Sequence, residues 1–363
     1  MASDLLSEYR VESFTAVVCD RNDRPLDTLD NITGGTITAS VDARIKTAGT
    51  LSVVTDKPIS WWANYRIKIF ANVNGKAWSL GVFLPSSPCM KHTAAGVEFT
   101  VELSDKLIIL DKDCISDALS IPVGTVLTRW VTNYITASGE TNINIEPSTR
   151  TNKRPLVWEP GTPKLTVIND ILDYIGYFSL LADENGQYIA SPYIVPAERP
   201  IMWRFGAGEY SLTSTDFTYE QNLDDIPNKI IYIAQSASTV VNGVTVEGTY
   251  KQQPLKAVAT NTDPASPFSY QNRGRWVTRV NVDAEAESLH ELQKMVDKAL
   301  NNAQDPFTRI ECRTALLPVR LNHLARFTTP DYDLVGAVRK TEVTLQPGSF
   351  MNVTLRKAKY ANL

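Results

Sequence analysis

The sequence predicts a β-rich α+β fold in which two β regions flank a mixed α+β region. Short runs with apolar residues at every second position dominate residues 9–103 and return after residue 200, and this period is that of an extended strand. Between residues 122 and 176 the apolar spacing is instead typical of amphipathic helices. At 363 residues, the chain is also too long for one ordinary domain.

We therefore expect three domains. Residues 1–103 form a first β domain, and residues 104–199 form an α+β domain with two helices and a hairpin. Residues 200–363 form a second β domain, which contains one long helix at residues 283–303. Short strands at this spacing, separated by turn residues, are typical of sandwiches and barrels.

A hairpin within residues 61–88 is the clearest element of the first domain. Apolar residues alternate on both sides of residues 72–75, whose sequence Asn-Val-Asn-Gly tolerates the positive φ of a tight turn. Pro85 and Pro88 follow the second strand. Because proline has no N–H to donate, we expect strand pairing to stop there.

The middle domain is predicted from two amphipathic helices and a second hairpin. Residues 122–137 carry one apolar stripe, and a second helix starts with Thr162 as its N-cap and Pro163 at its first position. Residues 183–186, Asp-Glu-Asn-Gly, form the hairpin turn. The polar residues 140–155 are expected to form an exposed loop.

Composition excludes several classes of function. The net charge of −4 gives no general attraction to nucleic acid or to an anionic membrane. No run approaches the roughly 20 apolar residues needed to span a bilayer, and the first ten residues lack the pattern of a signal peptide. The four cysteines are scattered, so we expect buried free thiols and synthesis in a reducing cytoplasm.

The sequence contains no recognisable catalytic constellation. Its three histidines, His92, His290 and His323, are far apart and none belongs to a paired metal-ligand motif. We expect a partly buried structural role for His290. No nucleophile elbow and no phosphate-binding glycine loop occur, so we expect no enzyme activity, no cofactor and no metal.

Six residues are candidates for an interface or a structural role: Trp61, Trp62, Trp78, Arg273, Arg275 and Trp276. The first three tryptophans could stack on sugar rings, although packing in a core or an interface is favoured because they flank alternating strands. Arg273 and Arg275 form, with Arg279, a basic cluster around Trp276 that could contact DNA or a charged partner. A strand with one solvated face is the favoured alternative.

Several stretches of the chain, in order, resemble the minor tail proteins of long-tailed phages, particularly those that infect actinobacteria. They are Trp-Trp at 61–62, Leu-Gly-Val-Phe-Leu-Pro-Ser-Ser-Pro at 80–88, Ile-Pro-Val-Gly-Thr at 121–125, Trp-Glu-Pro-Gly-Thr at 158–162, Ile-Pro-Asn-Lys at 226–229 and Asn-Arg-Gly-Arg at 272–275. The similarity extends from about residue 50 to the end of the chain.

This resemblance implies a tail-tip or baseplate hub protein. Such a protein is a homotrimer, in which two β-barrel-like tube domains per chain form a ring that continues the tail tube, with the α+β domain inserted between them. The implied partners are the tail tube, distal tail and tape measure proteins and the tip or receptor-binding proteins, with DNA passing through the lumen. The implied location is the tip of the virion tail.

Two other functions are alternatives to the hub. The first alternative is a tail module that binds host-surface carbohydrate through Trp61, Trp62 and Trp78. The second is a tail-tip peptidoglycan hydrolase, which would require acidic or histidine side chains that the sequence does not bring together.

Overall fold

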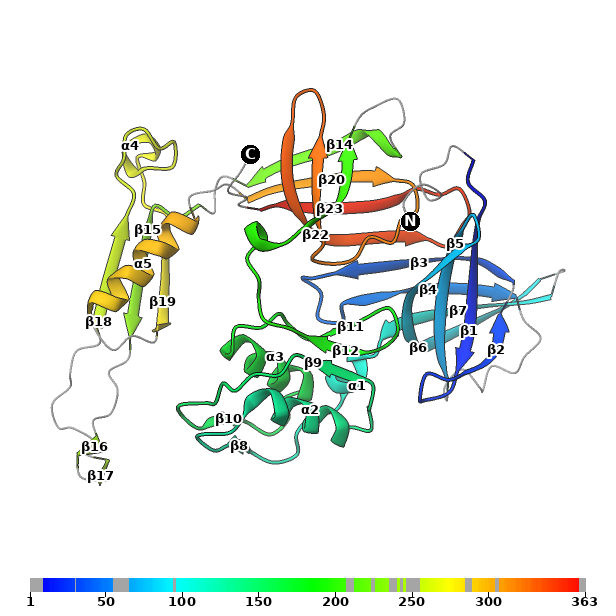
Figure 1. Ribbon diagram of the computed structural model, residues 1–363, viewed down its shortest axis with the longest axis horizontal. Coiled ribbons are helices and arrows are strands. Elements are labelled where there is room, and N and C mark those ends of the chain that lie inside the picture. Colours follow the sequence, from blue (N-terminus) through cyan, green and yellow to red (C-terminus); the bar gives the residue numbers. More distant parts are fainter. Residues whose placement is uncertain are drawn as a thin grey trace. The chain divides into compact units, whose positions relative to one another are not determined.

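The computed structural model describes residues 9–29, 31–54, 65–93, 96–206, 212–222, 226–234, 240–241, 244–245, 255–284, 289–303 and 307–358. The chain divides into two compact units (Figure 1). Unit 1 consists of Met1–Thr218 and Ile310–Leu363, and unit 2 consists of Tyr219–Arg309. The three predicted domains, 1–103, 104–199 and 200–363, remain a prediction.

Unit 1 is organised around one large sheet. In chain order its described strands are β1 (Glu12–Cys19), β2 (Pro25–Leu29), β3 (Ile32–Ser40), β4 (Thr47–Val54), β5 (Arg66–Val73), β6 (Lys76–Thr93), β7 (Gly96–Asp105), β13 (Ile201–Gly206), β14 (Thr213–Asn222), β20 (Phe307–Thr314), β21 (Leu324–Thr328), β22 (Asp333–Thr344) and β23 (Met351–Lys357). They pair in the order β14-β20-β23-β22-β3-β4-β7-β6-β5-β1-β2, and β21 joins β13 to β22. The β-rich α+β class predicted from the sequence is confirmed.

The pairing of β22 with β3 joins strands from the two ends of the chain. It is antiparallel and runs from Lys340 opposite Ser40 to Thr344 opposite Thr36. The early and late β regions therefore share one sheet. Among the described strands the pairing order ends at β14 on one side and β2 on the other, so these pairings close no barrel.

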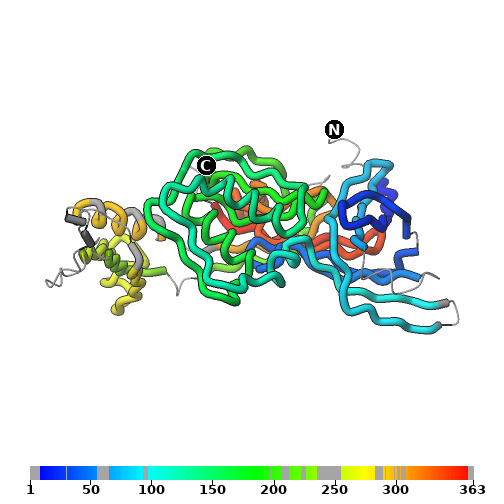
Figure 2. Tube along the Cα trace, turned by 90° about the horizontal axis from the view of Figure 1, so that it is seen from below, coloured from blue at the N-terminus to red at the C-terminus, as the bar shows by residue number. Residues whose placement is uncertain are grey.

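Strand β6 continues through the two prolines that were expected to end it, and this expectation was wrong. Up to Phe83 the strand pairs with β5, whereas from Phe83 to Thr93 it pairs with β7. Proline is tolerated here because this part of β6 has one described neighbouring strand, so N–H groups are needed on one side only. Pro85 still pairs with Leu103, and the register shifts between Ser86 and Cys89. The β6–β7 hairpin stands out from unit 1 in cyan (Figure 2).

A mixed module, residues 106–200, lies between β7 and β13 and is called the inserted module below. Its elements are α1 (Leu107–Lys112), β8 (Leu119–Ile121), α2 (Leu127–Ala137), β9 (Ile143–Ile145), β10 (Leu156–Trp158), α3 (Lys164–Tyr174), β11 (Leu181–Ala182), β12 (Tyr188–Ala190) and η3 (Pro196–Glu198). The three helices bury one continuous apolar core that includes Leu107, Val131 and Ile168.

The predicted elements of this module are present with shifted ends. The first helix starts at Leu127 rather than at residue 122, and the second starts at Lys164 with Pro163, not Thr162, in the N-cap position. The second hairpin forms where it was predicted, and Gly186 in its turn has a φ of +73°.

Unit 2 is a small sheet covered by one helix. Its elements are β15 (Lys229–Ala234), β16 (Val240–Val241), β17 (Val244–Thr245), β18 (Leu255–Thr260), α4 (Tyr270–Arg273), β19 (Thr278–Ala284) and α5 (Leu289–Ala303). The sheet order is β18-β15-β19, and Leu292, Val296 and Leu300 of α5 pack on one face. The helix predicted at 283–303 is described from Leu289; residues 283–284 end β19, and 285–288 lie outside the described residues. Among the helices described in either unit, none is both long and apolar enough to cross a membrane.

Candidate functional site

Four charged side chains, of which three are buried and one is partly buried, form a closed ring between the large sheet and the inserted module. Arg66 donates from Nη1 to Asp23 Oδ1 at 2.7 Å and from Nη2 to Glu140 Oε1 at 2.5 Å. Lys106 donates from Nζ to Asp23 Oδ2 at 2.8 Å and lies 2.7 Å from Glu140 Oε2. Positive and negative charges alternate, so each ion contacts two ions of the opposite sign.

The four members of this ring come from four separate segments. Asp23 lies in the β1–β2 turn, where its own φ is +65°, and Arg66 is the first residue of β5. Lys106 directly follows β7, and Glu140 follows Gly139, which has a φ of +87° after α2. Each of these segments therefore contributes one charge to the same point.

Burial makes the ring energetically important. The exposed fraction of the side chain is 1% for Lys106, 6% for Glu140, 8% for Arg66 and 12% for Asp23. Burial lowers the pKa of the Arg66 guanidinium, but its hydrogen bond to Asp23 and the two carboxylate charges outweigh this and raise that pKa. An ion pair shielded from water in this way is costly to break by removing one partner.

Tyr188 of β12 completes the ring from the side of the inserted module. Its hydroxyl donates to the carbonyl oxygen of Lys106 at 2.8 Å, and Lys106 Nζ lies 5.3 Å from the centre of the Tyr188 aromatic ring. Burial, followed by the negative charge of Glu140, raises the pKa of the Tyr188 hydroxyl, which therefore stays a donor. The described contacts of the ring hold the inserted module to the large sheet, and we call them the joint.

Sequence reasoning missed this joint. Residues 140–155 were expected to be an exposed loop, but Glu140 is 5% exposed and Asn152 is 1% exposed. A single acid after a helix-ending glycine carries no signal of burial, because its two cations are far away in the sequence. Only the fold brings Arg66 and Lys106 to it.

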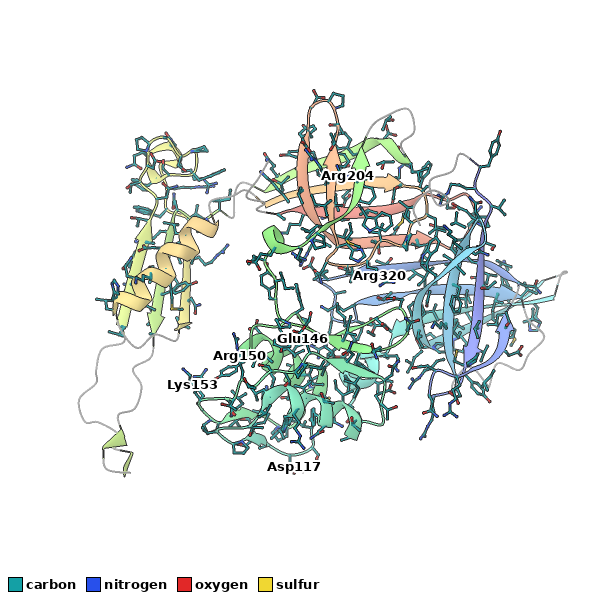
Figure 3. The ribbon with its side chains drawn as sticks, viewed as in Figure 1. Asp117, Glu146, Arg150, Lys153, Arg204 and Arg320 are labelled. Carbon is teal, nitrogen blue, oxygen red and sulfur yellow. The ribbon has the colours of Figure 1, made fainter. Side chains whose placement is uncertain are left out.

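The turn of the β11–β12 hairpin makes a second contact with the sheet. Lys68 Nζ donates to Asn185 Oδ1 at 2.9 Å, and Ser79 Oγ donates to the carbonyl oxygen of Glu184 at 2.5 Å. The Glu184 carboxylate also pairs with Arg320, which lies between the sheet and this hairpin (Figure 3). A Cβ on Gly186 would lie 3.1 Å from Lys106 Cδ, so the turn packs directly against the ring.

A cavity of about 340 Å³ lies beside this contact, lined by β3, β6, the β11–β12 hairpin and residues 317–323. Its lining includes Trp78, whose Nε1 is buried without a described hydrogen-bond partner. It also includes Asp105, whose pKa burial raises to about 7. Asp105 accepts hydrogen bonds from the backbone N–H of Thr47 at 2.6 Å and of Leu107 at 2.9 Å, so both carboxyl oxygens are occupied in building the fold.

His323 borders the same cavity and is held neutral by its surroundings. Its Nδ1 accepts hydrogen bonds from Trp203 Nε1 at 3.2 Å and from the backbone N–H of Arg320 at 3.3 Å. Burial, and then the charge of Arg320, lower its pKa to about 4. By contrast His290, expected to be partly buried, is exposed on α5.

Acidification is expected to destabilise the wild-type chain relative to a His323→Asn variant. The folded-state pKa of about 4 lies below the ordinary 6.5, so the unfolded chain binds the proton first as the pH falls between these values. The difference in free energy of unfolding between the two proteins should change across that interval and stay constant below it. Urea titrations at several pH values measure this, and a constant difference throughout would contradict the assignment.

The structure places the sequence-predicted residues in separate regions. Trp61 and Trp62 lie outside the described residues. Trp78 is a half-buried residue of β6 in unit 1, whereas Arg273, Arg275 and Trp276 belong to unit 2. Their predicted interface roles remain predictions.

The unit 2 residues form an aromatic and cationic cluster. Trp276 stacks on Tyr270 with ring centres 4.3 Å apart, and Lys229 Nζ lies 5.3 Å from the Trp276 ring centre. Arg273 donates from Nη1 to the carbonyl oxygen of Ile226 at 2.9 Å, which links α4 to the segment that precedes β15. The carbonyl oxygen of Arg275 accepts from Asn228 Nδ2 at 2.9 Å.

Metal-ligating and nucleophilic side chains are dispersed. No group of three or more His, Cys, Asp or Glu side chains that could hold a metal ion occurs among the residues with described positions. All four cysteines are free; Cys19 and Cys312 are buried, whereas Cys89 and Cys114 are exposed, so the expectation of buried thiols holds for two of them.

Three solved structures resemble this chain over nearly its whole length. The tail protein from Neisseria meningitidis matches with a TM-score of 0.67 at 11% sequence identity, covering 95% of this chain and 97% of that chain. The prophage MuSo2 43 kDa tail protein from Shewanella oneidensis gives 0.64 at 12% identity, with 95% and 98% covered. The fold is that of a phage tail protein.

A third tail-protein structure extends this agreement. The prophage tail protein gp18 from Listeria monocytogenes has a TM-score of 0.55 at 12% identity, and 94% of each chain is covered. No protein-family model and no curated protein matches the chain. The tail-protein resemblance found in the sequence motifs is thus confirmed at the level of the fold.

Proposed function

We propose that this chain is a structural protein of the phage tail tip, where it forms a hub ring that continues the tail tube. The observation that carries the proposal is the tail-protein fold, which is shared over 95% of the chain with the Neisseria tail protein. In this proposal the role is architectural rather than enzymatic, and the protein is located in the virion after synthesis in the host cytoplasm.

The proposed assembly is a homotrimer. Each chain contributes two β-barrel-like tube domains, residues 1–103 and 200–363, and residues 104–199 are inserted between them. DNA passes through the lumen, and the ring anchors tape measure, distal tail and tip or receptor-binding proteins. The large sheet supports this proposal because β2 and β14 are its terminal strands in the described chain, and neighbouring copies can cover such edges.

In this assembly the ring of ion pairs would hold the inserted module at a fixed angle to the sheet. A tube segment that carries further proteins must keep a constant angle between its sheet and its inserted module. Two of the ring's ion pairs, Arg66–Glu140 and Lys106–Asp23, join the sheet to the inserted module, and the Glu184–Arg320 pair joins them at a further point. Joining the two parts at more than one point opposes a hinge motion.

The mass of the purified chain in solution tests the proposal. Native mass spectrometry or analytical ultracentrifugation should give three times the 40.3 kDa chain mass, and labelled protein should appear at the tail tip in electron micrographs. A chain that stays monomeric even within assembled tails would contradict the hub.

A carbohydrate-binding tail module is the second candidate. The exposed Tyr270–Trp276 stack is the observation that favours it, because stacked aromatic rings can receive a sugar face. Trp78 favours it less, since its Nε1 is buried. A monomer that binds host glycans in a glycan array would support this function over the hub.

A further inference from the structure

Unit 2 presents an apolar sheet face opposite the one that α5 covers. Ala257 and Ala259 of β18 point toward the helix and are buried, whereas Val258 between them is 37% exposed. Antiparallel pairing puts Val258 beside Ile231, and parallel pairing puts Val280 beside the same residue. These three side chains therefore share the face away from α5.

The remaining residues of this face follow from strand periodicity. Its described positions are Lys229, Ile231 and Ile233 on β15, Lys256, Val258 and Thr260 on β18, and Thr278, Val280 and Val282 on β19. Val280 and Val282 are each about half exposed. Lys229, at one end of this face, contacts the Trp276 ring, so the exposed Tyr270–Trp276 stack adjoins the face and extends its apolar surface at that end. We call these residues the unit 2 face.

Charge restricts what the unit 2 face can bind. Its nine described sheet positions include two lysines, Lys229 and Lys256, and no acidic residue. The lysines lie near opposite ends of the apolar centre, since Lys229 pairs with Thr260 and Lys256 pairs with Ile233. The complementary partner is an apolar segment that carries a carboxylate at its end.

The face is small, so it favours a partner that other contacts already hold next to it. Three strands about 4.8 Å apart and five residues long cover roughly 250 Å², whereas a stable interface needs about 800 Å² from each partner. Alone, the face would hold a free protein weakly. Within a closed ring, it adds to other contacts between the same chains and its effective affinity rises.

A segment of unit 1 has the complementary character. Tyr193, Ile194 and Val195 are consecutive, and each is about half exposed. Tyr193 is held by Phe178, with ring centres 5.0 Å apart, so the segment is positioned before any partner arrives. Glu198, which is exposed, follows in η3 and supplies the carboxylate.

We propose that the unit 2 face docks on residues 193–195 of a second copy of this chain, with Glu198 of that copy near a lysine of the face. Each copy then offers one surface and receives the other, which is the heterologous contact that closes a ring. This inference rests on the proposed hub function and names the surfaces through which its copies meet.

Cross-linking between copies tests the contact. Ile194→Cys and Val280→Cys are combined in a chain carrying Cys89→Ser and Cys114→Ser, which removes the two exposed native thiols. Treatment of the assembled protein with a short bismaleimide should give covalent species of two and three chain masses on a denaturing gel. The matched control pairs Val280→Cys with Val123→Cys, an exposed valine of the inserted module, and should give no such species.

The outcomes separate this contact from the hub itself. A trimer by mass that yields no cross-link, or only links within one chain, overturns the contact and leaves the hub standing. A chain that stays monomeric even within assembled tails overturns both.

A charge variant gives an independent measurement. The double substitution Val280→Lys and Val282→Lys, at exposed positions, should raise the concentration at which trimers dissociate about tenfold or more. An unchanged dissociation concentration would also overturn the contact.

Discussion

Replacing Lys106 with methionine should lower the free energy of unfolding by about 3–5 kcal/mol, because it leaves buried carboxylates with half of their positive partners. Lys106 contacts both Asp23 and Glu140 and is 1% exposed at its side chain. Urea denaturation followed by circular dichroism measures the change. The inserted module should also become more accessible to protease, since its main joint to the sheet is weakened.

Two companion variants show whether burial is the cause. Lys340→Met removes an ion pair with Glu342 that is 42% and 34% exposed, and it should cost less than about 1 kcal/mol. Combining Lys106→Met with Glu140→Gln removes one charge of each sign and leaves Arg66 with Asp23. The double variant should therefore lose less than the sum of its two single variants. Additive losses would mean that the ring does not act as a unit.

Replacing Gly49 with alanine should lower the free energy of unfolding by more than about 3 kcal/mol, or prevent folding. A Cβ at this position would lie 1.9 Å from the carbonyl oxygen of Thr36 on the neighbouring strand β3. That strand cannot move away, because its other edge pairs with β22 from Lys340 to Thr344. A glycine in a strand often marks such a close approach of two backbones.

Gly34→Ala is the matched control for Gly49→Ala. Gly34 is also in this strand pair, but a Cβ there would meet nothing within 4 Å, and its φ is not positive. We expect its effect on the free energy of unfolding to stay within about 0.5 kcal/mol. Equal losses in the two variants, measured by the same denaturation, would show that backbone crowding at Gly49 is not the cause.

Local patterns predicted the elements well where a single segment determines them. The turn at residues 72–75 joins β5 and β6 as expected, because Asn74 and Gly75 both adopt positive φ. Helices α2 and α3 of the inserted module were likewise predicted from their apolar stripes, although each begins later than expected. These features depend on residues within a few positions of each other.

Predictions failed where a distant segment decides the outcome. Pro85 was expected to end its strand, yet β6 continues past it. At this point β6 pairs, among the described strands, only with β7, so a residue without an N–H is tolerated on the unpaired side. Glu140 was expected to lie in an exposed loop, yet its side chain is buried in ion pairs with Arg66 and Lys106 from other segments. His290 was expected to be partly buried on its helix, yet it is exposed in the fold.

By itself, the sequence determined the β-rich α+β class, the two hairpins and the likeness to tail proteins, because alternation, turn residues and ordered motifs are local properties of the chain. Only the tertiary structure decided that the first and last β regions share one sheet and that Asp23, Arg66, Lys106 and Glu140 meet in one ring. The physical reason is that pairing between distant strands and burial of a charge depend on neighbours that are brought together by the whole fold.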